Sequence, residues 1–415
     1  MALTGAPSTV WWNVYPLGAL GAPIREPHQD AVVHRLPRLH AWLDYAVGLG
    51  ATGLQLGPVF ASSTHGYDTV DHLRIDPRLG DGRDLVELVS AAHERGLLVM
   101  LDGVFNHVGA EHPQVRLALA QGPGGEAGAL FRIDWSDPSA PRPACFEGHE
   151  ALVELDHSSP AVVDLVVEVM NHWLRLGVDG WRLDAAYAVD PEFWARVLKR
   201  VRAEHPGAVI VGEVIHGDYA DVVESSGLDG VTQYELWKAI WSSIVDHNLF
   251  ELAHALERHD SFLAAFHPMT FVGNHDVTRI AERLGDAGAA VALAVLATVG
   301  GSPSVYYGDE QAYRGRKEDR LGGDDAVRPA LPPSPADLAA DGWWLYHRHA
   351  ELFALRRDLP WLADARTQVL ELSNERLVYA SVPPDRWAGP TGPSRRVLVT
   401  IDLTGVPTAT VSVAG

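Results

Sequence analysis

The feature that most constrains the fold of this chain is a repeated alternation of short apolar runs with longer amphipathic segments. The segments between the runs, such as 84–96 and 161–177, repeat apolar residues at helical spacing. Eight apolar runs predict β-strands: residues 10–15, 53–58, 97–102, 178–184, 209–213, 230–235, 269–274 and 303–308. Strands that alternate with helices form a parallel sheet, and eight such units close into a (β/α)8 TIM barrel. The sequence therefore predicts an α/β fold of this class.

We assign residues 1–107 and 158–360 to the barrel. Two further parts are predicted beside it. Residues 108–157 are too many for a simple loop and are rich in Gly, Pro and acidic residues, so we predict a short excursion domain after the third strand. The runs LVYASV and RVLVTIDL follow the last predicted barrel helix at 342–358. They predict a small C-terminal β domain over residues 361–415.

Composition excludes several classes of partner. The chain has 54 acidic and 33 basic residues and a net charge of -21, which is unlike the basic surface that nucleic acids require. The uncharged stretch 287–308 is rich in Ala and broken by GGSPS, so we predict a buried helix leading into a strand and no membrane span. The N-terminus lacks the basic start of a signal peptide, and the single Cys145 cannot form an intramolecular disulfide. We expect a cytoplasmic protein; its oligomeric state does not follow from the sequence.

Acidic residues stand at the ends of four predicted strands: Asp102, Asp184, Glu213 and Asp276. In a barrel, the C-terminal strand ends and their loops form the reaction face. One isolated polar residue there is usually a cap or a satisfied core group, but this pattern repeats at four strands. The sequence therefore predicts a catalytic site built from carboxylates.

The motifs around these acids resemble a known family. Four of them occur in order, each at the end of a predicted strand: DGVFNH (102–107), GWRLD (180–184), GEV (212–214) and VGNHD (272–276). They resemble the four signature regions of the α-amylase family, glycoside hydrolase family 13. VELDHSSP (153–160) and HGYDTVDHLRIDPRLG (65–80) are similar to two further family segments. The resemblance covers residues 10–360 and is closest to the intracellular, oligosaccharide-active members.

The resemblance implies a mechanism of double displacement with retention of the α configuration. Asp184 would be the nucleophile that attacks the anomeric carbon, and Glu213 the general acid and base. Asp276 would be the third carboxylate, which holds sugar hydroxyls and stabilises the cation-like transition state. In retaining enzymes the two reacting carboxyl groups lie about 5–5.5 Å apart.

The same resemblance implies substrate-binding roles for three aromatic side chains. Tyr67 would stack beneath the reacting sugar, and His107 and His275 would donate hydrogen bonds to its hydroxyls. Each of these residues, taken alone, is more typical of core packing, and the motif context favours the substrate-binding role.

Arg182 alternates with Asp184 along one strand, so both side chains can point to one side and pair. A neighbouring guanidinium favours an ionised Asp184. We expect Asp102 to order the site through Arg182 without touching the substrate.

The segment GGDDAVRP (322–329) resembles an Asp-x-x-Arg-Pro stretch of oligosaccharide-active relatives. That resemblance implies that Asp325 and Arg328 recognise the sugar next to the cleaved bond. The alternative is a solvated charged loop.

Asn106 raises the question of a metal. In many family members this Asn binds a structural calcium, often together with a His four residues after the nucleophile, where this chain has Ala188. Calcium takes six or more oxygen ligands. We therefore expect Asn106 to fix a loop by hydrogen bonding, we predict no metal ligands and no required cofactor, and a structural calcium stays open.

The function implied is a retaining glycoside hydrolase that cleaves α-glucosidic bonds of malto-oligosaccharides or related short α-glucans. One alternative is an α-glucan transglycosidase, which passes the sugar to another sugar, and another is a phosphorylase acting on sucrose. An alternative of another class is a non-catalytic, carbohydrate-binding family member. Such relatives typically lose one acid, whereas all three are present here.

Overall fold

The computed structural model describes residues 8–25, 31–320, 322–387 and 395–414. Its centre is a parallel eight-stranded sheet in which each strand pairs with its neighbour in chain order. The strands are β1 (Trp11–Val14), β2 (Gly53–Leu56), β5 (Leu98–Gly103), β10 (Gly180–Leu183), β11 (Val209–Gly212), β12 (Gly230–Val231), β13 (Met269–Phe271) and β14 (Ser302–Tyr306). β1 pairs with both β2 and β14, and a parallel bridge between Thr232 and Met269 joins β12 to β13, so the sheet closes into a barrel. The predicted TIM barrel is confirmed.

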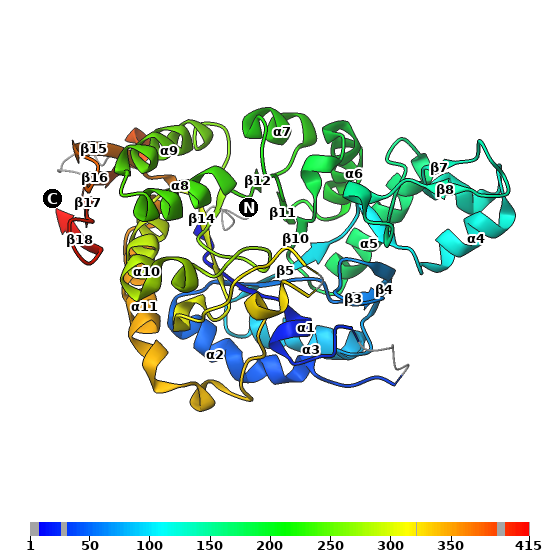
Figure 1. The fold of residues 1–415 in the computed structure, drawn as a ribbon, viewed down its shortest axis with the longest axis horizontal. Coiled ribbons are helices and arrows are strands. Elements are labelled where there is room, and N and C mark those ends of the chain that lie inside the picture. The colour runs from blue at the N-terminus through cyan, green and yellow to red at the C-terminus, as the bar shows by residue number, and fades with distance from the viewer. Residues whose placement is uncertain (1–7, 26–30, 321, 388–394, 415) are drawn as a thin grey trace.

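Helices surround the barrel, as Figure 1 shows. They are α1 (Pro16–Ala19), α2 (His40–Leu49), α3 (Gly82–His93), α5 (Pro160–Arg175), α6 (Pro191–Glu204), α7 (Tyr219–Ser226), α8 (Tyr234–Val245), α9 (Leu249–Phe262), α10 (Ile280–Thr298) and α11 (Trp343–Asp358). The uncharged stretch 287–308 forms the end of α10 followed by β14, as predicted. No helix within the described ranges has the length and apolar character needed to cross a membrane.

The strand that falls furthest short of its predicted range is β12. The sequence assigned residues 230–235 to a strand, but β12 ends at Val231 and α8 begins at Tyr234. Gln233 caps this helix, because its side-chain oxygen accepts a hydrogen bond from the backbone N–H of Leu236. The cap turns the chain into the helix before the strand can continue.

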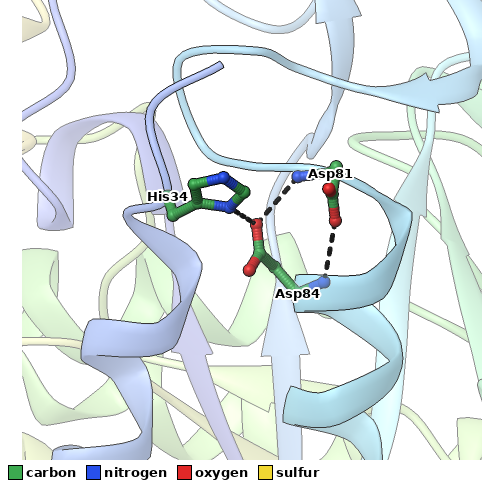
Figure 2. A group of neighbouring side chains, drawn as sticks. All are labelled: His34, Asp81 and Asp84. Carbon is green, nitrogen blue, oxygen red and sulfur yellow. Dashed lines mark hydrogen bonds and ion pairs between the residues drawn. The ribbon is translucent and has the colours of Figure 1, made fainter.

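Helix α3 begins at a cluster of three polar side chains, drawn in Figure 2. Asp81 accepts hydrogen bonds from the backbone N–H groups of Arg83 and Asp84, and an oxygen of Asp84 accepts from the N–H of Asp81 in return. His34 Nδ1 lies 2.6 Å from the same Asp84 oxygen. These carboxylates satisfy the free N–H groups of the helix start, which is a capping box.

Residues after the third barrel strand form an excursion at one end of the molecule, at the right of Figure 1. In it β6 (His107–Gly109) pairs with β9 (Leu152–Glu154), and β7 (Ile133–Asp134) with β8 (Arg142–Pro143). Helix α4 (Pro113–Gln121) lies between β6 and β7 in sequence. A separate hairpin of β3 (Phe60–Ser62) and β4 (Thr69–Ile75) follows β2.

The C-terminal residues form an antiparallel sheet at the opposite end of the molecule (Figure 1). Its order is β15 (Arg366–Leu372), β16 (Arg376–Val382), β17 (Arg396–Asp402) and β18 (Thr408–Ala414). The sheet contacts α10: Tyr379 Oη lies 2.7 Å from Thr298 Oγ1, and Ser381 Oγ donates to the Thr298 carbonyl at 2.7 Å. The predicted β domain is confirmed, and it shares its core with the barrel helices.

Candidate active site

The four predicted acids all lie at the C-terminal ends of barrel strands. Asp102 belongs to β5, Asp184 directly follows β10, and Glu213 directly follows β11. These three strands are neighbours in the sheet, and the carboxyl groups of all three residues are buried. Asp276 lies beyond β13, in the segment that leads to α10, and its side chain is 36% exposed.

Arg182 joins three of these acids. Its Nη1 lies 2.8 Å from Asp102 Oδ1 and 2.8 Å from Asp184 Oδ1, and its Nη2 lies 2.6 Å from Glu213 Oε1. The predicted pairing with Asp102 and Asp184 is present, because Arg182 and Asp102 are register partners on β10 and β5. The contact with Glu213 was not predicted. One buried cation thus serves three carboxyl groups.

The balance of charge in this cluster differs from the sequence-based expectation. Burial raises the pKa of Asp184 well above its usual range, and this effect outweighs the lowering by Arg182. Burial likewise raises the pKa of Asp102, again against Arg182. Arg182 does lower the pKa of Asp184, as the sequence predicts, but one cation shared among three acids does not offset their removal from water.

Asp276 is in the opposite situation. Burial by itself would raise its pKa, but His275 and Arg328 lower the pKa well below its usual value. His275 Nε2 lies 3.0 Å from one carboxyl oxygen and Arg328 Nη2 lies 2.9 Å from the other. Asp276 is therefore ionised at neutral pH.

The two residues predicted from the 322–329 motif, Asp325 and Arg328, lie in different surroundings. Arg328 is buried, bonds both Asp276 and the His275 carbonyl, and lies over the Tyr15 ring at 4.8 Å. The side chain of Asp325 is 52% exposed and accepts hydrogen bonds from Arg25. The preceding residue, Asp324, is the one that contacts Arg328, at 3.2 Å. The structure thus brings Arg328 to the acids and joins Asp325 to Arg25 instead.

Aromatic rings pack against the imidazole of His275. The Tyr67 ring is stacked on it with centroids 5.1 Å apart and an angle of 5°, and the Tyr15 ring is stacked at 6.0 Å and 4°. The hydroxyl of Tyr67 also donates to Asp102 Oδ2 at 3.1 Å. Tyr67 and His275 are therefore brought together with the acids.

His107 and Asn106 support this arrangement from the excursion side. Burial lowers the pKa of His107 to about 4, so its ring is neutral near pH 7. His107 Nε2 lies 3.1 Å from the Tyr67 carbonyl, which can only accept, so Nε2 carries the proton. Nδ1 then accepts from the side-chain amide of Asn106 at 3.1 Å. Asn106 thus makes the kind of loop-fixing hydrogen bond that the sequence predicts.

Of the two side chains that the resemblance links to calcium, this chain keeps Asn106 and has Ala188, which offers no ligand atom, at the second position. The amide nitrogen of Asn106 is bonded to His107, so its amide oxygen is the side-chain atom that could face a cation. Across the described part of the chain, one group of three His, Cys, Asp or Glu residues has ligand atoms close enough to share an ion, and it is the α3 capping cluster of Figure 2. We derive no catalytic step through a metal.

Besides the contact of Arg182, two contacts to Glu213 and one that supports them escaped the sequence analysis. Tyr234 Oη donates to Glu213 Oε1 at 3.0 Å, and the backbone N–H of Ala185 donates to Oε2 at 3.0 Å. Asn274 Nδ2 donates to Tyr234 Oη at 3.0 Å. Asn274 lies within the VGNHD motif, which was a usable signal, whereas Tyr234 was assigned to a strand end.

Comparison with known proteins identifies the family. The model of the alpha amylase catalytic domain matches residues 39–127 and 145–337. The chain belongs to the α-amylase family.

Individual relatives support the same assignment. A cyclomaltodextrinase of Geobacillus thermopakistaniensis (strain MAS1) is 33% identical over 81% of this chain and 58% of its own length. An intracellular maltogenic amylase of Bacillus subtilis (strain 168) is 29% identical over 75% of this chain and 56% of its own length. This chain thus spans less than two thirds of the length of either curated relative.

A solved structure of the cyclic alpha-maltosyl-(1→6)-maltose hydrolase from Arthrobacter globiformis, in complex with cyclic alpha-maltosyl-(1→6)-maltose, superposes with a TM-score of 0.80. It is 23% identical and covers 95% of this chain and 90% of its own. At this identity the likeness concerns the fold.

Proposed function

We propose that this protein is a retaining glycoside hydrolase that cleaves α-glucosidic bonds of malto-oligosaccharides or related short α-glucans. The observation that carries the proposal is the pair of Asp184 and Glu213 at neighbouring strand ends, joined through one guanidinium, with an ionised Asp276 beside His275. Retaining glycosidases require such a pair of carboxyl groups, which flank the scissile bond.

The chemistry proceeds in two displacements. Asp184 attacks the anomeric carbon while Glu213 transfers a proton to the departing glycosidic oxygen, which leaves a glycosyl ester on Asp184. Glu213 then takes a proton from water, the water oxygen bonds to the anomeric carbon, and the ester bond to Asp184 breaks. Asp276 carries negative charge beside the positive charge that develops on the sugar.

The charge of the acid cluster supports this starting state. Burial raises the pKa of both Asp184 and Asp102, which favours a proton within the buried cluster around Arg182. A proton shared by interacting carboxyl groups belongs to the set. When the substrate takes that proton at the glycosidic oxygen, Asp184 is left ionised next to Arg182 and can act as the nucleophile.

We further propose a neutral oligosaccharide as the partner, a cytoplasmic location and no required cofactor. The name of the Bacillus subtilis relative, an intracellular maltogenic amylase, supports the location and the substrate class. The net charge of -21 suits a neutral substrate better than an anionic one.

Product analysis by chromatography tests the proposal. The purified protein is incubated with maltose, maltotriose, cyclodextrin, trehalose and sucrose, with Asp184→Asn as the inactive control. We expect shorter sugars from maltotriose or cyclodextrin, released first as the α anomer. Products longer than the substrate would show a transglycosidase, and phosphate-dependent cleavage of sucrose a phosphorylase. Binding without any product would favour a carbohydrate-binding protein.

A further inference from the structure

A chain of three hydrogen bonds connects the third carboxylate to the predicted general acid. The backbone N–H of Asp276 donates to Asn274 Oδ1 at 2.9 Å, Asn274 Nδ2 donates to Tyr234 Oη at 3.0 Å, and Tyr234 Oη reaches Glu213 Oε1 at 3.0 Å. Tyr234 is the first residue of α8 and is buried, so these bonds form away from bulk water.

The direction of this chain is fixed by its first member. A backbone N–H can only donate, so the Asn274 atom that faces Asp276 must be the amide oxygen. The amide nitrogen then faces Tyr234 and donates to the phenol oxygen. The single phenol proton of Tyr234 is therefore free to point in one useful direction, toward Glu213 Oε1.

The two oxygens of Glu213 are consequently different. Oε1 accepts from Tyr234 and also lies 2.6 Å from Arg182 Nη2, so two donors face it. Oε2 accepts one bond, from the backbone N–H of Ala185 at 3.0 Å. Ala185 follows Asp184 directly and has a positive φ of 45°. A carboxyl oxygen has two lone pairs, so Oε2 keeps one that can hold a proton.

We propose that Tyr234 and Asn274 are positioning residues that keep Glu213 Oε1 as an acceptor, so that Oε2 is the atom that carries the catalytic proton. The inference rests on the proposed function and adds an atomic assignment to it. In the first displacement the proton moves from Oε2 to the glycosidic oxygen as the bond from the anomeric carbon to that oxygen breaks and the bond to Asp184 forms. In the second, a proton of the attacking water returns to Oε2.

The first test removes the phenol with Tyr234→Phe. Hydrogen bonds to charged groups correspond to about ten- to a hundredfold in a rate when lost. We expect kcat/KM for maltotriose to fall by about this factor. An aryl α-glucoside has a leaving group that departs almost without protonation, so its kcat/KM should fall much less. Glu213→Gln provides the reference for this dependence on the leaving group.

The second test reverses the middle of the chain with Asn274→Asp. A carboxylate has no proton to donate, so it accepts from both Asp276 N–H and Tyr234 Oη and turns the phenol proton away from Glu213. We expect the same substrate-dependent loss as in Tyr234→Phe. The double variant should be no worse than either single one, because all three changes remove the same hydrogen bond.

Tyr219→Phe is the matched control. Tyr219 is also buried, and its hydroxyl donates to the Ile215 carbonyl at 3.0 Å rather than to an acid. We expect its kinetics to be unchanged, and thermal melts check that every variant is folded.

Equal losses on the two substrates, or losses that multiply in the double variant, would overturn the assignment while the hydrolase itself stands. A wild-type protein that cleaves neither substrate would overturn the proposed function and, with it, this inference.

Discussion

Two arginines, Arg182 and Arg279, lie buried at the C-terminal end of the barrel. They differ in the number of carboxyl groups that they contact. Arg182 faces three carboxyl groups: Asp102, Asp184 and Glu213. Arg279 faces one, Asp309 at 2.7 Å. Its remaining hydrogen bonds go to the carbonyls of Tyr307 and Val327 at 2.9 Å each, and its guanidinium lies over the Tyr306 ring at 4.6 Å.

The difference separates a structural ion pair from a reactive one. The Arg279 pair has no excess charge, and it fixes the loop that carries Val327 and Arg328 beside Asp276. The Arg182 cluster has more acids than cations, which is unfavourable in a buried site. Such a site is stabilised when positive charge develops near it, as it does on the sugar in the transition state. The excess of acids around Arg182 thus lowers the free energy of unfolding but stabilises the transition state.

The largest expected effect is that of Asp184→Asn on activity. The amide is nearly isosteric but is a far weaker nucleophile, so we expect turnover of maltotriose to fall by at least about a thousandfold. The same change removes one excess acid from Arg182, so the melting temperature should stay equal or rise. Initial rates and a thermal melt measure both. A variant with a tenth of the wild-type activity would disprove the role of Asp184.

Arg279→Met should have the opposite profile, with its main effect on stability. Removing the cation leaves Asp309 buried without a partner, which costs about 3–5 kcal/mol of the free energy of unfolding. Adding Asp309→Asn should restore much of that loss. Urea unfolding measures it, with Arg314→Met as the control, because Arg314 and Asp286 form an exposed pair of the kind that contributes about 0–1 kcal/mol. An equal loss of unfolding free energy in Arg279→Met and Arg314→Met would contradict the view that the buried pair is the structural one.

A smaller effect is expected at Glu310, next to Asp309. Burial raises its pKa from 4.5 to about 7. A folded-state pKa above the unfolded value means that the wild type loses stability as the pH rises from 4.5 toward 7 and that the loss is complete above 7. Glu310→Gln carries no such charge and should gain about 1–3 kcal/mol relative to wild type at pH 8, but nothing at pH 4.

Urea unfolding across this pH range tests the Glu310 prediction. The exposed Glu87→Gln is the control and should leave the pH dependence as it is. A pH-independent difference between Glu310→Gln and wild type would contradict the expected protonation.

The smallest expected effect is that of metal removal. A tight calcium that binds only the folded state would raise the melting temperature by mass action. Because position 188, where many family members carry a second calcium ligand, is Ala, we expect EDTA to leave both activity and melting temperature nearly unchanged. A fall of many degrees that calcium reverses would show that a metal contributes to the charge balance near the acids.

Much of the fold could be predicted because its signals are local. Apolar runs and helical periodicity located all eight strands. The alternation of Arg182 with Asp184 predicted that these two side chains form an ion pair. The end of β12 was missed, since the cap at Gln233 competes with strand propensity there. The strands β15 and β18 were not located individually, because many of their residues are exposed and lack a strong apolar pattern.

The rest of the site depends on contacts between distant segments. The bond between Tyr234 and Glu213 joins the first residue of α8 to the residue that follows β11, and no periodicity encodes it. The partner of Asp325 is Arg25, from near the other end of the chain. The charge of Asp184 depends on burial and on three neighbours at once, which motif matching does not weigh.

The contact of the C-terminal sheet with α10 has a consequence for cooperativity. Residues 291–298 of α10 are all buried, and Thr298 bonds both Tyr379 and Ser381 of β16. Without the sheet, this alanine- and valine-rich helix would present an apolar surface to water. We therefore expect barrel and sheet to unfold as a single unit, because strands β16, β17 and β18 pack as part of the barrel's own core and not as a module that could be removed or exchanged.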